Sequence, residues 1–199
     1  MKTKELIAKT ALKLFLQKGY YNMSMAKIAA EIRISKPAIY YHFKDKDAMV
    51  HGVLNYYTAK MKTWSSHYFA DLESGEDFLE RMFLAIPIFQ NIEQVLLNET
   101  AEKYLYSYND LLTIVAKIKP EFRIRISEDL VNTRQLLEYN IRRAQNEHLL
   151  RPDLRASQLA ILIQTIIEGS GFISELDPSL KAESLSAEMY RILWKLIKK

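Results

Sequence analysis

The chain begins with an apolar stripe whose members recur at helical spacing. Along the first twenty residues the stripe consists of Ile7, Ala8, Ala11, Leu12, Leu14 and Phe15. Residues three and four apart share one side of a helix, so this pattern predicts an amphipathic helix. Gly19 follows Lys18 where the stripe ends, and glycine adopts the left-handed C-terminal conformation without a steric penalty. We therefore predict a first helix that ends at Lys18.

Two short helices are predicted between Ser24 and Phe43. Ser24 stands where an N-cap is needed, before the apolar positions Met25, Ile28, Ala29 and Ile32. After a break at Arg33-Ile34, Ser35 is the next N-cap candidate. Pro37 lies in the first turn of the following helix, where proline removes only a donor that has no helical partner. The chain thus predicts a short helix, a tight turn and a second short helix.

The second short helix has an inner and an outer side. Ile39 and Phe43 are four residues apart and are expected to face inward. This leaves Lys36, Ala38, Tyr41 and His42 nearer the outside. Two short helices joined by a turn, behind a supporting first helix, form the helix-turn-helix arrangement. The outer side carries small or hydrogen-bonding side chains, so this helix can enter the major groove of DNA.

The remainder of the chain predicts successive amphipathic helices. Asp45 is expected to cap a long helix that begins near Lys46. The apolar rows span about residues 49–64, 78–89, 96–115, 122–149, 159–167 and 185–197. Pro87 is expected to kink or shorten the second of these helices, and the third is expected to run through Leu96 and Tyr104 and to stop before Pro120. No internal repeat or low-complexity segment occurs.

Composition agrees with an all-α fold. The 199 residues contain only 5 Gly and 5 Pro, and alternating apolar and polar runs are scarce. No cysteine occurs, which excludes disulfides, thiol catalysis and cysteine-rich metal sites. The start of the chain does not resemble a signal peptide, and the most apolar run, Leu159 to Ile167, is too short to span a bilayer and contains Gln164. We expect a soluble cytoplasmic protein with no membrane partner.

The positive charge is concentrated in the first quarter of the chain. Residues 1–50 carry ten Lys and Arg against four Asp and Glu, a net +6, while the whole chain has +4 and the remainder therefore −2. This asymmetry indicates either an N-terminal module that meets a polyanion or a lysine-rich solvated helix.

The residues that decide between these alternatives resemble the N-terminal signature of the TetR family of repressors. The resemblance runs from Ala11-Leu12-Lys13-Leu14-Phe15 through Lys18-Gly19-Tyr20 and Ser24-Met25-Ala26-Lys27-Ile28-Ala29 to the segment Ser35–Lys46, and covers about residues 5–54. It implies an N-terminal helix-turn-helix DNA-binding domain, residues 1–47, followed by a helical effector-binding and dimerisation domain, residues 48–199. The sequence departs from the family pattern at Arg33, because the family usually has glycine at this position of the turn. A non-glycine residue at positive φ costs about 1–2 kcal/mol, so either the turn relaxes or packing elsewhere offsets the strain.

The resemblance also implies which residues contact DNA. It assigns Lys36 and Ala38 to base edges, Ser24 and Lys46 to phosphates, and the aromatic residues of the second short helix to backbone or bases. The full predicted set is Ser24, Lys27, Ser35, Lys36, Pro37, Ala38, Tyr40, Tyr41, His42 and Lys46. Two alternatives stay open: Tyr40 can be partly core, and Lys46 can be a solvated first-turn lysine.

The family's middle helices commonly enclose a small molecule. The residues whose chemistry suits a largely apolar effector are Trp64, Tyr68, Phe83, Phe89, Tyr104 and Tyr108. Glu168, one turn after Gln164, can hydrogen-bond either a ligand or a dimer mate. Aromatic residues at helical spacing are also what an ordinary core contains, and that alternative stays open.

A homodimer is expected through the last two helices. Their broad apolar stripes suggest an interface formed by Leu159, Ile163, Ile166, Ile167, Met189, Leu193 and Leu196, on helices that the family uses for dimerisation. Two DNA-binding helices about 34–36 Å apart would meet successive major grooves, which implies an inverted-repeat operator.

The resemblance therefore implies a ligand-responsive repressor of transcription. One alternative is a DNA-binding regulator that is controlled by a protein partner or that lacks a small-molecule effector. An enzyme is the other alternative, but the four histidines lack metal-ligand spacing, and no phosphate loop or nucleophile signature occurs. We expect no catalytic residue, no metal and no cofactor.

Overall fold

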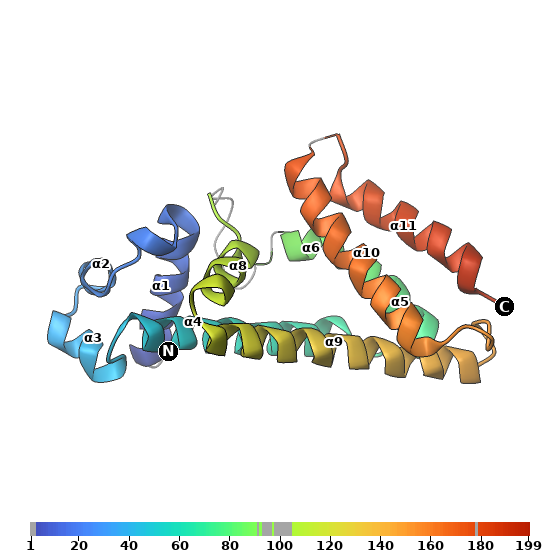
Figure 1. The fold of residues 1–199 in the computed structure, drawn as a ribbon, viewed down its shortest axis with the longest axis horizontal. Helices are drawn as coiled ribbons and strands as arrows, with labels where there is room; N and C mark the ends of the chain where they lie inside the picture. Colours follow the sequence, from blue (N-terminus) through green and yellow to red (C-terminus); the bar gives the residue numbers. More distant parts are fainter. Residues whose placement is uncertain (1–2, 91, 93–96, 98–104, 178) are drawn as a thin grey trace. The chain divides into compact units, whose positions relative to one another are not determined.

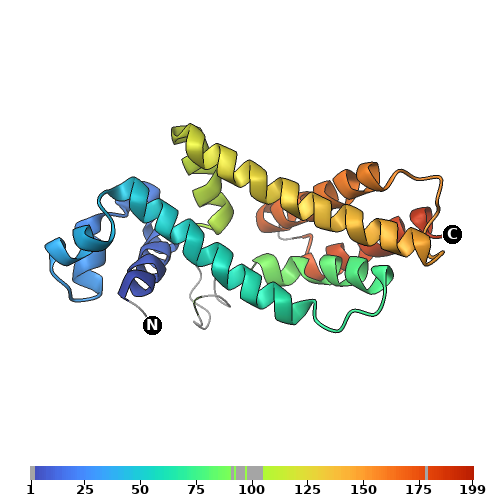
Figure 2. The same cartoon turned by 90° about the horizontal axis from the view of Figure 1, so that it is seen from below.

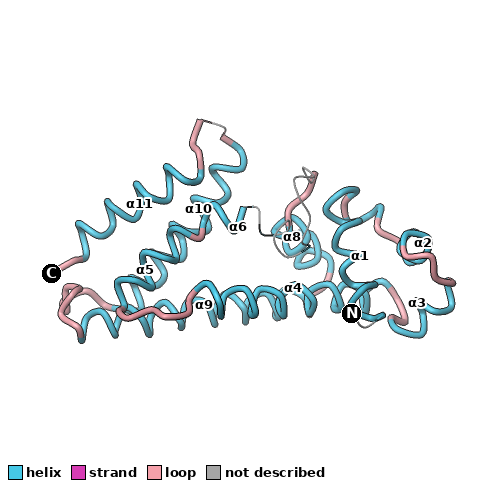
Figure 3. The backbone as a smooth tube through the Cα atoms, turned by 180° about the vertical axis from the view of Figure 1, so that it is seen from behind, coloured by secondary structure: helices cyan, strands magenta, loops and turns pink. Residues whose placement is uncertain are grey.

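The computed structural model describes residues 3–90, 92, 97, 105–177 and 179–199. Regular structure in these ranges is helical and contains no strand (Figure 3). One isolated antiparallel bridge joins Leu150 and Lys198. The prediction of an all-α fold is confirmed. The chain forms two compact units, residues 1–68 with 93–123 and residues 69–92 with 124–199. The predicted functional division after residue 47 stays a prediction.

The first unit is built on the N-terminal helices, labelled in Figure 1. Its elements are α1 (Thr3–Lys18), the 3-10 helix η1 (Tyr20–Asn22), α2 (Met25–Glu31), α3 (Lys36–His42), α4 (Lys46–Tyr68), α8 (Tyr108–Ile118) and the first turn of α9 (Pro120–Asn146). The predicted stripe of α1 is buried, and Gly19 ends the helix at φ 78, with its N–H donating to the carbonyl of Phe15 at 2.7 Å. We call residues 3–43, which contain α1, α2 and α3, the N-terminal module.

The second unit contains α5 (Gly75–Leu84), α6 (Ile86–Gln90), the rest of α9, α10 (Ala156–Leu176) and α11 (Ala182–Ile197). The helices α5, α9, α10 and α11 lie next to one another (Figure 2), and their buried side chains form one core. Phe83, Ile141 and Ile163 are fully buried there. Pro87 lies at the second position of α6 after α5 has ended at Leu84, which confirms the predicted interruption.

The predicted third middle helix was wrong at its start. α8 begins only at Tyr108, because Ser107 caps it: the Ser107 hydroxyl accepts from the N–H of Asp110 at 3.2 Å, and the Asp110 carboxylate accepts from the N–H of Ser107 at 2.8 Å. This reciprocal capping box fixes a helix terminus inside the apolar row. Leu96 and Tyr104, through which that helix was predicted to run, lie outside the described residues.

One further prediction, about α10, is corrected. The segment Leu159 to Ile167 was predicted to be too short to span a bilayer. The whole helix, however, has 21 residues with a mean hydropathy of 1.4 over its most apolar window, so by length and composition it could cross a membrane. Within the chain one face is buried, by Ala160, Ile163 and Gln164, while Ile161 and Leu162 are about half exposed.

Candidate nucleic-acid interface

Serine caps fix the starts of both short helices in the N-terminal module. The Ser24 hydroxyl accepts a hydrogen bond from the N–H of Lys27, and the Ser35 hydroxyl accepts one from the N–H of Ala38, each at 3.3 Å. Each bond satisfies a donor that has no partner inside its helix. The two predicted N-caps are confirmed, and with them the start of α3.

The turn between α2 and α3 keeps the left-handed conformation despite lacking glycine. Arg33 has φ 55; its N–H donates to the carbonyl of Ala30 at 3.2 Å, and the N–H of Ile34 donates to that of Ala29 at 3.0 Å. These two bonds are the Schellman pattern of a helix C-terminus. Of the two outcomes that the sequence left open, the turn has not relaxed.

α3 presents one side to solvent. Ile39 and Phe43 are buried as predicted, at 0% and 3% exposure, whereas Tyr41 is 86% exposed. The exposed members of the predicted DNA-contacting set are Ser24, Lys27, Ser35, Lys36, Pro37, Tyr40 and Tyr41, and the half-buried members are Ala38, His42 and Lys46. Tyr40, at 43% exposure, lies between core and surface. The outer face of α3 therefore offers a cation, a phenol hydroxyl and a small side chain, which are groups that can contact bases and phosphates.

A close packing contact holds the end of α3 against α4. The ring of Phe43 lies so near the backbone of Gly52 that a methyl group on Gly52 would be 2.4 Å from Phe43 Cε1 and 2.7 Å from Cζ. Any residue larger than glycine must displace the ring. The sequence analysis missed Gly52, although a glycine inside an otherwise regular helix often marks a close approach.

Lys46 is held within the N-terminal part of the chain. Its Nζ donates to the carbonyl of Tyr20 at 2.7 Å and lies 3.9 Å from the centroid of the Tyr20 ring. Burial lowers the pKa of Lys46, against the smaller opposite effect of Asp47. These contacts fasten the first turn of α4 to η1, a role that sequence reasoning did not assign. Contact of Lys46 with phosphate stays a prediction, for which the two remaining ammonium protons are available.

Residues distant in sequence contact the N-terminal module and the start of α4. The N–H groups of Leu105 and Tyr106 both donate to the carbonyl of Leu16 at 3.0 Å, near the C-terminus of α1. Lys119, just before α9, forms an ion pair at 2.5 Å with Asp47 in the first turn of α4. The Asp47 carboxylate raises the pKa of Lys119 above its ordinary value. These contacts come from tertiary structure, and no local sequence pattern indicated them.

Comparison with known proteins identifies the N-terminal module. Residues 7–53 match the model of the family described as bacterial regulatory proteins, tetR family. Residues 7–53 therefore form a TetR-type N-terminal domain. Over 64 residues it is 53% identical to an uncharacterized HTH-type transcriptional regulator, YuxN, of Bacillus subtilis (strain 168). That match covers 32% of this chain and 22% of YuxN, so it spans about a fifth of the relative's length.

Solved structures share the TetR-family fold over nearly the whole chain. A protein from Saccharomonospora viridis, solved in complex with choline, superposes with a TM-score of 0.80 at 18% identity, covering 98% of this chain and 97% of that one. A TetR transcriptional regulator from Chloroflexus aurantiacus J-10-FL has a TM-score of 0.75 at 18% identity, with 98% and 96% covered. At this identity the likeness concerns the fold alone.

The residues predicted to bind an effector are divided between the two units of the chain. In the first unit, Trp64 stacks on Tyr68 with ring centroids 4.7 Å apart, and Tyr108 stacks on Tyr57. In the second unit, Phe83 is fully buried in the core, and its ring centroid lies 5.6 Å from that of Tyr190. Tyr104 and the side chain of Phe89 lie outside the described residues. Effector binding by this set stays a prediction.

The two polar candidates on α10 have different surroundings. Gln164 is buried, and its side-chain amide donates to the carbonyl of Leu130 at 3.1 Å. Glu168 is exposed, although partial desolvation raises the pKa of its carboxyl group. Gln164 is therefore already used within the chain, whereas Glu168 remains available to a ligand or a dimer mate.

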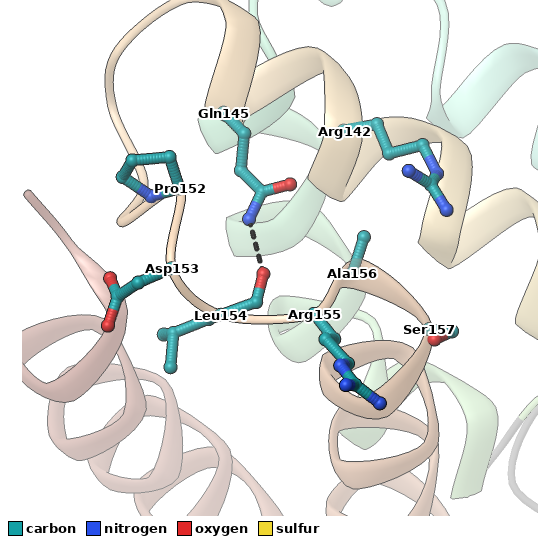
Figure 4. A pocket seen from close by; sticks show the side chains of 8 residues that line it. All are labelled: Arg142, Gln145, Pro152, Asp153, Leu154, Arg155, Ala156 and Ser157. Carbon is teal, nitrogen blue, oxygen red and sulfur yellow. Dashed lines mark hydrogen bonds between the residues drawn. The ribbon is translucent and has the colours of Figure 1, made fainter.

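A hollow of about 310 Å³ lies in the second unit, at the turn between α9 and α10 (Figure 4). Its lining consists of Arg142, Gln145, Pro152, Asp153, Leu154, Arg155, Ala156 and Ser157. Gln145 spans the turn by donating to the carbonyls of Leu154 and Arg151 at 2.7 and 2.9 Å. None of the residues predicted to bind an effector lines this hollow.

The residues predicted for the dimer interface separate into core and surface. Leu159, Ile163 and Leu193 belong to the core of the second unit, with 7%, 0% and 5% exposure. Ile166, Ile167 and Met189 are half-buried against that core, and Leu196 is 63% exposed. Other apolar side chains of α10 and α11 are exposed, namely Ile161, Leu162, Phe172, Ile173, Leu176 and Ile192. The apolar surface free for a partner thus overlaps the predicted set mainly at Leu196.

No group of three or more His, Asp or Glu side chains that could hold a metal ion occurs among the residues that the structure describes.

Proposed function

We propose that this TetR-family chain is a homodimeric transcriptional regulator that binds inverted-repeat DNA through α3. The observation that carries the proposal is the outer face of α3, where Lys36 and Tyr41 are exposed while Ile39 and Phe43 anchor the helix from behind. The net +6 of residues 1–50 supports it, since a basic module attracts the phosphate backbone. In the cell the protein works in the cytoplasm, where DNA is its partner.

The experiment is selection of bound fragments from random duplex DNA by the purified chain, followed by binding measurements on the enriched sequence. We expect enrichment of one sequence in wild type and its loss in a Lys36→Ala/Tyr41→Ala variant. Both side chains are exposed, so the variant should fold as the wild type does. Enrichment that is identical in the two proteins would contradict the assignment of α3.

Dimerisation is proposed through exposed apolar residues of α10 and α11. Phe172, Leu176 and Leu196 are 63–66% exposed in the single chain. Contact of such large apolar surfaces with water is unfavourable, so burial against a partner would stabilise them. Gly169 and Gly171 lie in the interior of α10 with open space beside them. Glycine inside a helix costs about 1 kcal/mol relative to alanine, and open space beside it lets another helix approach closely.

Light scattering with size-exclusion chromatography tests the interface. Leu196→Glu should convert a dimer into a folded monomer, because it places a charge in the contact. Leu136→Glu is the matched control, since Leu136 is 50% exposed on α9, outside the proposed surface. A dimer that survives Leu196→Glu, or a protein that is monomeric from the start, contradicts this surface.

The proposed regulation is repression relieved by a largely apolar small molecule. The aromatic candidates Trp64, Tyr68 and Tyr108 support an apolar ligand, and the Saccharomonospora viridis protein, which shares the fold and was solved with choline, supports small-molecule binding in general. A ligand can release DNA only if it binds the released state more tightly than the DNA-bound state. Native mass spectrometry of the purified protein should detect a copurifying small molecule whose addition weakens DNA binding. DNA binding with no such molecule would favour control by a protein partner.

A further inference from the structure

The turn between α2 and α3 holds an arginine in a conformation that suits glycine. Arg33 has φ 55, and both hydrogen bonds of the Schellman pattern, from the N–H groups of Arg33 and Ile34, require this left-handed backbone. A side chain with a β-carbon is strained in this region, whereas glycine is not. The backbone strain therefore arises because arginine occupies this position, since glycine would adopt the same turn without strain.

The other left-handed residues show that Arg33 is different. Asp71 and His148 also have positive φ, at 60 and 59. His148 closes the same pattern at the end of α9, with its N–H and that of Leu149 donating to carbonyls at 3.0 Å. Asp and His belong to the residue types that are enriched in the left-handed region, and Arg does not. Local preference explains the first two residues but leaves Arg33 unexplained.

The Arg33 residue is exposed. Within the described ranges, no ion pair or hydrogen bond to its guanidinium is found, although Glu31 is two residues away. Strained residues cluster at functional sites, where the surrounding structure maintains them for another purpose. A guanidinium presents several donors in a planar fork that matches phosphate oxygens. Arg33 therefore combines unexplained strain with a free group that suits a phosphate.

Arg33 lies close in sequence to the proposed DNA surface. It lies two residues before Ser35, the cap of α3, and three residues before the exposed Lys36. We propose that the Arg33 guanidinium binds a backbone phosphate of the DNA beside the site that α3 contacts, and that the strained turn is what positions it. This inference rests on the proposed function, because it adds a contact to the same DNA surface.

The test compares Arg33→Gly, Arg33→Asn and Arg33→Lys in full-length protein, with thermal unfolding and with DNA affinity measured between 50 and 200 mM salt. Glycine relieves the strain, so Arg33→Gly should raise Tm by about 2 °C. It should also reduce the slope of log affinity against log salt concentration by about 0.9 for each DNA-binding domain engaged. The ratio of wild-type to variant DNA affinity should therefore fall roughly threefold per domain between 50 and 200 mM salt. Asn tolerates positive φ without charge and should act like Gly, whereas Arg33→Lys should keep both the wild-type slope and the wild-type Tm.

Two control variants separate the effects of strain and charge. His148→Gly relieves the equivalent turn in the other unit and should leave the salt slope unchanged. Lys62→Gln removes one positive charge from an exposed position of α4, 16 residues after Lys46 and thus about 24 Å along the helix. A salt slope of Arg33→Gly equal to that of wild type, or reduced no more than in Lys62→Gln, overturns the phosphate contact while the proposed function stands. Failure of the wild type to bind any DNA overturns the proposed function, and the contact with it.

Discussion

Replacement of Gly52 by alanine tests whether the Phe43 ring fixes α3 on α4. Alanine in a helix interior is about 1 kcal/mol more favourable than glycine, so without the ring the substitution would stabilise the protein. The new methyl group would lie 2.4 Å from Phe43 Cε1, against about 3.5–4.0 Å for a normal carbon contact. The ring is 3% exposed and must move by about 1 Å in a packed environment, which costs about 1–3 kcal/mol. Gly52→Ala should therefore range from neutral to about 2 kcal/mol destabilising.

A double-mutant cycle with Phe43→Leu isolates this contact. Leucine lacks the two ring atoms, Cε1 and Cζ, that the new methyl group would meet, so Gly52→Ala should become stabilising in the Phe43→Leu background. The four proteins are compared by urea unfolding, and we expect a coupling energy of about 1–3 kcal/mol between the two positions. Gly52→Ala should also weaken DNA binding, since the ring it displaces ends α3. Additivity within about 0.5 kcal/mol, or a stabilising Gly52→Ala in the wild type, would refute the reasoning.

Three further predictions follow from the described contacts. Tyr41→Ala should weaken specific DNA binding by about 1–3 kcal/mol without changing Tm, whereas Tyr139→Ala, also at an exposed tyrosine but on α9, should change neither; equal losses in the two would count against α3. Ser35→Ala should cost about 1 kcal/mol in urea unfolding because Ala38 loses its cap, and an unchanged midpoint would mean that the cap contributes nothing. The hydrogen bond with the Ser74 hydroxyl holds the pKa of the Asp77 carboxyl group below its ordinary value, so Asp77 stabilises the fold above its unfolded pKa of about 3.9, and this stabilisation is lost as the pH falls further. Asp77→Asn should make the free energy of unfolding depend less on pH in this acidic range. An unchanged pH dependence in the variant would contradict this cause.

Local signals in the sequence predicted the N-terminal module well. Ser24 and Ser35 were found as caps because hydroxyl side chains satisfy helix N-termini, and Gly19 was found as a stop because of its conformational freedom. The four-residue spacing of Ile39 and Phe43 was sufficient to predict the buried side of α3. Each of these features depends on residues that are near one another in the chain.

Features that depend on tertiary structure could not be predicted in this way. The contacts of Lys46 with Tyr20 and of Lys119 with Asp47 join positions 26 and 72 residues apart. Likewise, the helical period shows that α10 and α11 have broad apolar faces, but it cannot tell which side meets the chain's own core. For this reason Leu193 was predicted at the dimer surface although it is buried within the chain.

One local signal was present and overlooked. Ser107 and Asp110 have the spacing of a capping box, which marks a helix start, but the apolar row around them favoured a continuous helix. The helix start at Tyr108 is determined by these hydrogen bonds and not by hydrophobic periodicity.

Selection of DNA from a random duplex library by the wild-type dimer tests the central claim most directly. The account predicts enrichment of an inverted repeat whose half-sites are centred about one helical turn apart, 10–10.5 base pairs, or a multiple of it. It also predicts that Lys36→Ala changes the preferred bases within the half-sites while their spacing stays the same, because α3 contacts the bases and the dimer sets the distance. No enrichment, or an enriched sequence without two-fold symmetry, would contradict it.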